Sequence, residues 1–131
     1  MFPSTPKQLI ALVSREVERM QKIEAIIRPE RLEPVREALE ARGFNSMTIT
    51  DVQGRGRQKG IQLEWRVGTY NVEFLPKIKV EIVCEDDEYR AIIDIICKAA
   101  ETGEVGDGKI FISEVKEVVR IRTKESGAIA L

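Results

Sequence analysis

Apolar residues recur along this chain with two different spacings, and the order in which these spacings alternate limits the fold more than any single motif. A spacing of two residues predicts a strand with one buried face, and a spacing of three to four predicts a helix. Residues 22–28 alternate in the first manner, and Leu32, Val35 and Leu39 then recur in the second. Gly43 follows, where glycine can adopt the left-handed conformation that ends many helices.

The rest of the chain continues the same two spacings. Further strands are expected over residues 44–52, 74–84, 110–112 and 117–122. A second helix is expected from a cap at Asp86 or Asp87 to Ala100, with an apolar stripe of Ile92, Ile93, Ile96 and Cys97. The order βαββαβ predicts an α+β, ferredoxin-like fold with both helices on one face of an antiparallel sheet. The other face needs cover, which predicts a close homo-oligomer.

Composition narrows the class of protein. The 131 residues, 43% of them hydrophobic, suit one globular domain, and the net charge of −1 argues against a basic nucleic-acid-binding surface. The chain has no histidine, which disfavours histidine-assisted nucleophiles and ordinary zinc catalysis. Cys84 and Cys97 are expected to be buried free thiols in a reducing compartment. No membrane span or signal peptide is predicted, and a cytoplasmic location is expected.

Residues 1–19 form an N-terminal extension with competing interpretations. Pro6 can start a helix, and Leu9, Ile10 and Val13 fall roughly on one face, so a short docking helix or an appendage without a fixed role is expected. Alternatively, residues 15–19 can be encoded by a bacterial ribosome-binding sequence, which would make Met20 the physiological start. A native N-terminal peptide beginning upstream of Met20 would exclude that hypothesis. The folded domain is expected over residues 20–131.

A long connection between two expected strands stands out within residues 52–79. It begins with the basic, glycine-spaced run Gly54–Gly60 and is longer than most connections in compact domains. Glycines at a strand exit let several N–H groups converge on an anion, and the arginines and lysine add charge. The run lacks the Gly-Lys-Ser/Thr of a phosphate-binding P-loop and the spacing of a dinucleotide-binding fingerprint. Phosphate or carboxylate binding and a solvated flexible turn both remain open.

Two further segments have the composition of anion sites. Residues 102–109 place three glycines around Asp107 and end in Lys109, although a helix cap followed by a turn also accounts for Gly103. Arg120 and Arg122 alternate on an expected strand, so both guanidinium groups should share one face. With no nucleophile or acid–base pair in evidence, the three segments together favour binding of a phosphorylated small molecule without turnover, so an enzyme is not expected.

These segments resemble those of the P-II signal transduction proteins, the nitrogen-regulatory family, over essentially all of residues 20–122. The matching runs are KIEAIIRP at Lys22–Pro29, GRGRQKG at Gly54–Gly60, FLPK at Phe74–Lys77, TGEVGDGKIF at Thr102–Phe111 and VRIRT at Val119–Thr123.

The resemblance implies a compact homotrimer of ferredoxin-like subunits in which ATP and ADP compete for clefts between neighbours. The nucleotide-binding residues that it implies are Thr48, Gly54, Arg57, Gln58, Glu81, Val83, Gly106, Asp107, Gly108, Lys109, Arg120 and Arg122. Residues 106–109 would hold the phosphates, and Arg120 and Arg122 would reach in from the adjacent subunit.

The resemblance also implies a metal and an effector. With MgATP bound, the side-chain oxygen of Gln58 would ligate Mg²⁺, and 2-oxoglutarate would complete the metal shell. The implied 2-oxoglutarate residues are Gly56, Gln58, Lys59, Gly60 and Lys77. Because each ligand would complete the coordination of the other, ATP and 2-oxoglutarate should bind with positive coupling, which is reciprocal.

The long connection then corresponds to the family's T-loop, at about residues 55–73, which docks on regulatory targets. The implied targets are ammonium channels, the glutamine synthetase system, acetylglutamate kinase, two-component kinases and nitrogenase regulators, without membrane insertion or direct nucleic-acid contact. Residues 102–109 become a second nucleotide loop, followed by a C-terminal strand and tail over 117–131.

The chain departs from the family pattern at the T-loop tip and in the second nucleotide loop. Tyr70 falls on the tyrosine that many bacteria uridylylate, so it is a candidate for uridylylation or adenylylation. Its neighbours Trp65 and Val67 are unusual, however, and Gly68 replaces the serine that some relatives phosphorylate. Glu104 stands where the family usually has lysine. The alternative is therefore a specialised P-II-like regulator with a different effector or a target outside nitrogen metabolism.

Overall fold

The computed structural model describes residues 19–56, 61–65, 68–72 and 74–131. Its elements, in chain order, are β1 (Met20–Ile27), η1 (Pro29–Arg31), α2 (Leu32–Ala41), β2 (Thr48–Gly54), β3 (Ile61–Trp65), β4 (Gly68–Val72), β5 (Leu75–Glu85), α3 (Tyr89–Ala100), β6 (Gly108–Val115) and η2 (Ala128–Ala130). The sequence hypotheses for residues 1–18 lie outside the described residues.

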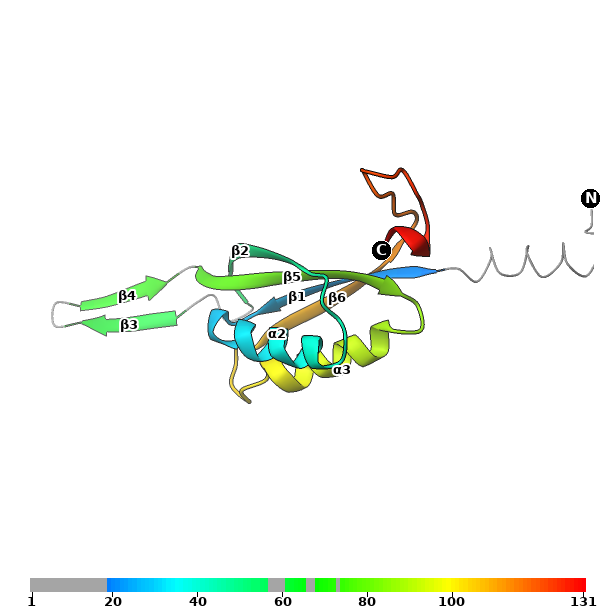
Figure 1. Ribbon diagram of the computed structural model, residues 1–131. Coiled ribbons are helices and arrows are strands. Elements are labelled where there is room, and N and C mark those ends of the chain that lie inside the picture. The colour runs from blue at the N-terminus through cyan, green and yellow to red at the C-terminus, as the bar shows by residue number, and fades with distance from the viewer. Residues whose placement is uncertain (1–18, 57–60, 66–67, 73) are drawn as a thin grey trace, which may run out of the picture.

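Four strands form one antiparallel sheet in the order β2-β5-β1-β6 (Figure 1). The central strand β1 pairs with β5 on one side and β6 on the other, so Ile23 lies opposite both Ile82 and Ile112. Two strand–helix–strand units that interleave in this order define the ferredoxin-like fold. The predicted α+β fold is confirmed.

Both helices pack on the same face of the sheet, as the alternating pattern predicted (Figure 1). The residues that meet between the two layers are buried and almost entirely aliphatic. They are Ile23, Ala25, Ile27, Val35, Leu39, Ile78, Val80, Ile82, Cys84, Ile92, Ile96 and Ala100. Burial of this apolar surface is the main favourable contribution to folding.

The helix ends follow local chemistry, with one exception. Gly43 has a φ of +85°, which is the left-handed conformation predicted for the residue after α2. The predicted cap of α3 is wrong, because α3 begins at Tyr89 and Glu88 occupies the cap position without a capping side-chain hydrogen bond. Asp86 and Asp87 lie instead in the turn before the helix.

The opposite face of the sheet is polar at its centre and is not covered by either helix. Lys22 bridges the carboxylates of Glu24 and Glu81 at 3.0 and 3.4 Å, and Lys79 contacts Glu81 at 3.2 Å. Lys22 thereby separates two carboxylates that stand directly opposite each other on β1 and β5. The homo-oligomer expected to cover this face stays a prediction.

The long connection between β2 and β5 contains regular structure that the sequence pattern did not predict. Strands β3 and β4 pair antiparallel in a separate two-stranded sheet, with Ile61 opposite Val72 and Leu63 opposite Tyr70. This hairpin lies beyond one end of the main sheet in Figure 1. The described part of the connection is therefore a paired ribbon in place of the expected irregular loop.

Two other sequence predictions are wrong. Residues 117–122 do not form a strand: within the described residues, their ladder contact is an isolated bridge between Val119 and Ser126, and 121–123 form a turn. Cys97 is exposed on α3, whereas Cys84 is buried as predicted, and both thiols are free. Along the described parts of the chain, no helix is both long and apolar enough to cross a membrane.

Candidate functional site

The segment that joins α3 to β6, residues 101–107, is organised by the carboxylate of Asp107. This carboxylate accepts hydrogen bonds from the backbone N–H groups of Thr102 at 2.8 Å and Gly103 at 3.0 Å. The Thr102 hydroxyl and Arg28 Nε donate to its other oxygen. The hydrogen bonds from Thr102 are the largest cause that holds the pKa of Asp107 well below its usual range, so the group is ionised at neutral pH. Asp107 therefore fixes the loop by its own contacts.

Arg28 ties this loop to the end of β1. Its Nε donates to Asp107 at 3.0 Å, and its Nη2 donates to the main-chain oxygen of Val105 at 2.7 Å. A guanidinium with two donors on one loop fixes the orientation of that loop as well as its position. Sequence reasoning assigned no role to Arg28. The available signal was a cationic side chain directly after a core strand and before Pro29.

Three glycines give the loop its backbone course. Gly103, Gly106 and Gly108 have φ values of +85°, +97° and +111°, which side chains rarely tolerate. At Gly108 a Cβ atom would lie 1.7 Å from the main-chain oxygen of Ile26. The start of β6 is thus pressed against the neighbouring strand, and glycine is required there for steric reasons.

Lys77 connects this loop to the root of the β3–β4 connection. Its ammonium group donates to the main-chain oxygen of Gly106 at 2.5 Å, and its side chain passes Gly54, the last residue of β2. Burial, and then the nearby charge of Arg28, lower the pKa of Lys77. The structure therefore brings together Gly54, Lys77 and Gly106, which the sequence analysis had assigned to separate segments.

Three more of the expected nucleotide residues lie on the open face of the sheet. Thr48 on β2 stands directly opposite Glu81 on β5, and Val83 follows on the same face of β5. The hydrogen bond from Lys79 is the largest cause that lowers the pKa of Glu81. This carboxylate is therefore an ionised acceptor held between two lysines.

Other expected ligand and modification residues belong to the T-loop. Arg57, Gln58, Lys59 and Gly60 lie outside the described residues, as does the side chain of Tyr70. Gly56 is exposed beside them. Their assignments to ligands, metal and modification stay predictions.

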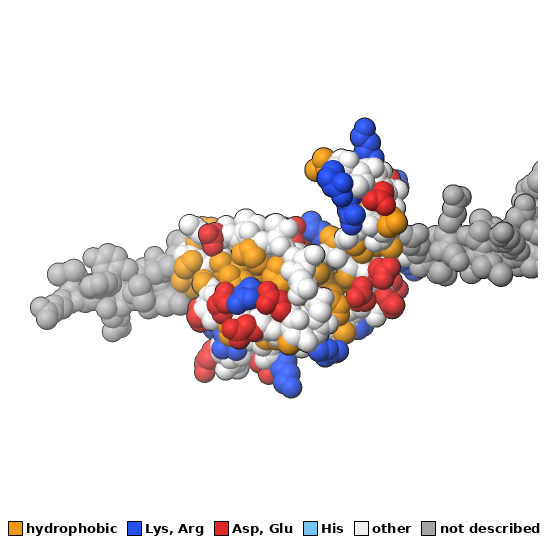
Figure 2. All heavy atoms as spheres, viewed as in Figure 1, with side chains coloured by type: hydrophobic (Ala, Val, Ile, Leu, Met, Phe, Trp, Pro, Cys, Tyr) orange, Lys and Arg blue, Asp and Glu red, His pale blue; other side chains and the backbone are white. Residues whose placement is uncertain are grey.

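Arg120 and Arg122 do not join the loop within one chain. The loop precedes β6 and the two arginines follow it, and the eight residues of β6 span about 24 Å at the rise of an antiparallel strand. Figure 2 shows basic side chains on the C-terminal segment, which stands away from the body of the domain. The guanidinium of Arg120 is bonded within that segment, to the main-chain oxygens of Ile129 and Leu131.

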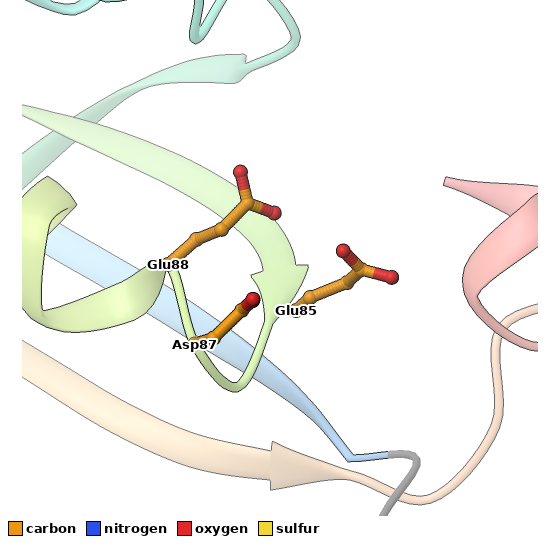
Figure 3. Close-up of side chains that lie close together, drawn as sticks. All are labelled: Glu85, Asp87 and Glu88. Atoms are coloured by element: carbon orange, nitrogen blue, oxygen red, sulfur yellow. The ribbon is translucent and has the colours of Figure 1, made fainter. Parts of the chain in front are cut away.

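An acidic cluster marks the turn between β5 and α3. Glu85, Asp87 and Glu88 bring carboxylate oxygens within 4.8 Å of one another (Figure 3). Exposed carboxylates at a turn commonly gather in this way without an ion. Burial, and then these charges, raise the pKa of the neighbouring Cys84 thiol to about 11, so this thiol is protonated and unreactive at neutral pH.

The fold and the loop define a class: a ferredoxin-like domain with a glycine-rich, cation-lined loop at one end of its sheet. The model of the nitrogen regulatory protein P-II family matches residues 20–125. This chain therefore belongs to the P-II family of nitrogen-regulatory signal transducers.

Curated relatives agree over most of the chain. "Nitrogen regulatory protein P-II 2" of Methanothermobacter thermautotrophicus is 55% identical over 112 residues, covering 86% of this chain and 97% of the relative. "Nitrogen regulatory protein GlnK" of Escherichia coli is 48% identical over 112 residues, covering 86% of this chain and 100% of the relative. A crystal structure of Arabidopsis thaliana PII bound to citrate superposes with a TM-score of 0.71 at 38% identity, covering 87% of this chain and 94% of that chain.

Proposed function

We propose that this protein is a homotrimeric regulator that senses ATP or ADP together with 2-oxoglutarate and controls nitrogen-assimilation targets through its T-loop. One observation supports this proposal above the others: Lys77, at the root of the T-loop, donates directly to Gly106 in the glycine-rich loop. A ligand held by one of these segments must therefore alter the surroundings of the other.

The nucleotide would lie in the cleft between subunits of a trimer built from residues 20–131. The phosphates would meet the loop at Gly106, Gly108 and Lys109, which are exposed. The two glycines have no side chain to keep an anion away from the backbone N–H groups. Thr48, Glu81 and Val83 would contact the nucleoside from the open face of the sheet. Arg57 would contribute from the T-loop root, and Arg120 and Arg122 from the adjacent subunit.

The carboxylate effector would bind at the T-loop root. Lys77 would pair with one carboxylate of 2-oxoglutarate, and the backbone near Gly56, Lys59 and Gly60 would hold the rest. Gln58 would supply an amide oxygen to Mg²⁺, which prefers oxygen ligands. That a related plant protein binds citrate, another polycarboxylate, supports a carboxylate effector in this family.

The regulated target is left open between two proposals. The favoured target class is the nitrogen-assimilation machinery: an ammonium channel, the glutamine synthetase system or a nitrogenase regulator, met in the cytoplasm. The alternative is a specialised regulator with a different effector or a non-nitrogen target, favoured by the unusual sequence around Trp65 and Val67. Modification of Tyr70 would add a second input at the same tip.

Calorimetry with ATP, ADP and 2-oxoglutarate, added in every order, tests the central proposal. We expect 2-oxoglutarate to bind only when MgATP is present, and each ligand to tighten the other by the same factor. Failure of 2-oxoglutarate to bind in the presence of MgATP would exclude the effector and leave the alternative.

A substitution at the proposed metal ligand separates effector binding from nucleotide binding. Gln58→Ala should abolish 2-oxoglutarate binding and leave ADP binding largely intact, because ADP does not require the effector-linked metal. Equal loss of both ligands would show that Gln58 has a structural role.

A further inference from the structure

The C-terminal segment folds back on itself and engages one of the proposed ligand residues. The guanidinium Nη2 of Arg120 donates to the main-chain oxygens of Ile129 at 3.1 Å and Leu131 at 3.0 Å. Its Nη1 lies 3.7 Å from a carboxylate oxygen of Glu125. Both outer nitrogens of the guanidinium thus face acceptors from its own chain.

Several backbone contacts hold this arrangement together. The N–H of Arg120 donates to the main-chain oxygen of Glu125 at 2.9 Å, and the N–H of Gly127 donates to that of Val118 at 3.0 Å. Gly127 has a φ of +84° and a ψ of −160°, a conformation that is essentially restricted to glycine. From this turn, η2 brings the oxygens of residues 129 and 131 to the guanidinium, and Ala130 is buried.

A guanidinium that binds phosphate uses the same fork of N–H donors that these main-chain oxygens occupy. The two sets of acceptors therefore exclude each other. The main-chain oxygens are neutral and Arg120 is partly exposed, so an anionic ligand can displace them at a cost in affinity.

We propose that residues 126–131 form an internal strap that competes with the phosphates of a nucleotide for Arg120. The inference rests on the proposed function, because it takes the anion to be the nucleotide of the adjacent subunit. Release of the strap is the expected consequence of nucleotide binding, so the chain has a second ligand-dependent segment at the end of β6 opposite the T-loop.

Calorimetry with ATP and ADP on a double-mutant cycle tests the strap. A chain shortened to end at Ser126, which removes residues 127–131, should bind both nucleotides about fivefold to 150-fold more tightly than the full chain, the range expected for removing two competing hydrogen bonds. In the Arg120→Ala background the same shortening should leave affinity unchanged. No gain on shortening, or an equal gain in both backgrounds, would overturn the proposal.

Gly127→Val provides a second test in a chain of full length. A valine at this φ and ψ is strained, so the strap should open without any loss of residues. Affinity should rise in the same direction as on shortening, and sedimentation should show an unchanged assembly. Weaker binding by Gly127→Val with an intact assembly would contradict the strap.

The reciprocal effect is measurable in the unaltered protein. Because the coupling acts in both directions, saturating ATP should accelerate hydrogen exchange at the strap amides of Gly127 and Ala130, which donate to the main-chain oxygens of Val118 and Gly127. Unchanged exchange with bound ATP would overturn the proposal. Absence of nucleotide binding by the full and the shortened chain alike would overturn the proposed function and the strap with it, whereas binding without any effect of the strap would overturn the strap alone.

Discussion

The two ends of β6 carry proposed ligand residues that are prepared in opposite ways. At one end, the loop of residues 101–107 is fixed by contacts from its own chain, with Asp107 and Arg28 at the centre. At the other end, Arg120 is also fixed by its own chain, but those contacts occupy the donors that a ligand would need. The donors and glycines of one end are held in place by contacts that leave the loop exposed, whereas the donors of the other end are already engaged.

The difference shows how much of the proposed site a single chain can complete. Preorganisation lowers the cost of binding, because the groups are ordered before the ligand arrives. An engaged donor raises that cost by the free energy of the contact that it must first lose. The rigidity of the loop should therefore increase nucleotide affinity. The contacts of Arg120 with its own chain should decrease it, because they compete with the nucleotide for the same donors.

The largest effect is expected from Gly108→Ala, which would break the preorganised end. Its Cβ would meet the main-chain oxygen of Ile26 at 1.7 Å, at a φ of +111°. The loss of stability should be about 3 kcal/mol or more, with loss of nucleotide binding. Urea unfolding measures the first and calorimetry the second. In the control Gly56→Ala, the added Cβ meets nothing within 4 Å, and stability should change by less than about 0.5 kcal/mol.

Removal of Arg120 should have the next largest effect. Arg120→Ala should weaken nucleotide binding by ~1.5–3 kcal/mol, the usual range for a hydrogen bond to a charged group. Calorimetry measures this change. Arg36→Ala removes the same charge from α2, where Arg36 pairs with Glu33 and Glu40, and should leave nucleotide affinity unchanged. Equal affinities of the Arg120 variant and the unaltered chain would contradict its assignment to the site.

Asp107→Asn tests the preorganised end without a steric clash. The amide replaces one carboxylate oxygen with a donor group, which then faces either the N–H groups of Thr102 and Gly103 or the guanidinium of Arg28. We expect roughly tenfold weaker nucleotide binding from the loosened loop. Asp94→Asn, at an exposed position on α3, makes the same chemical change. Titration calorimetry should show the same nucleotide affinity for this control as for the unaltered chain.

The smallest effect concerns pH. Hydrogen bonds from Thr102 depress the pKa of Asp107, so its ionised form stabilises the fold above about pH 4, the usual value for an aspartate, and this stabilisation is lost as pH falls toward the depressed pKa. The stability difference between the unaltered chain and Asp107→Asn should therefore be constant near neutrality and shrink below about pH 4. A difference that grows on acidification would show that Asp107 does not titrate in this way.

Sequence patterns predicted those features that depend on neighbours along the chain. The apolar stripe of α2, most of the stripe of α3 and the left-handed Gly43 follow from residue spacing and are present. The strand expected over 117–122 failed because alternation does not supply a partner strand. Backbone N–H and C=O groups need hydrogen-bond partners. In this segment the partners come from the residues that follow it: Val119 bridges to Ser126, Arg120 N–H donates to Glu125, and Val118 C=O accepts from Gly127.

Two other features differ from the sequence predictions: Cys97 is exposed where burial was predicted, and a β3–β4 hairpin stands where a loop was predicted. Cys97 is adjacent to the buried Ile96, and a small rotation of the helical stripe places it outside the contact with the sheet. The β3–β4 hairpin had a signal in the sequence, because Ile61, Leu63 and Trp65 alternate with polar residues. That run is only five residues long and follows the basic, glycine-spaced residues 54–60, so the sequence alone favours a loop there.

By itself, the sequence determined the layers of this domain, the glycines at which its loops turn, and the runs that place it among the P-II proteins. Each of these depends on residue type and local spacing, and both can be read from the sequence. Only the tertiary structure decided that Arg28 holds Asp107, that Lys77 reaches Gly106 and that Arg120 is engaged by residues 129 and 131. These pairs join residues that are distant in sequence or separated by a turn, and their contact exists only once the chain has packed.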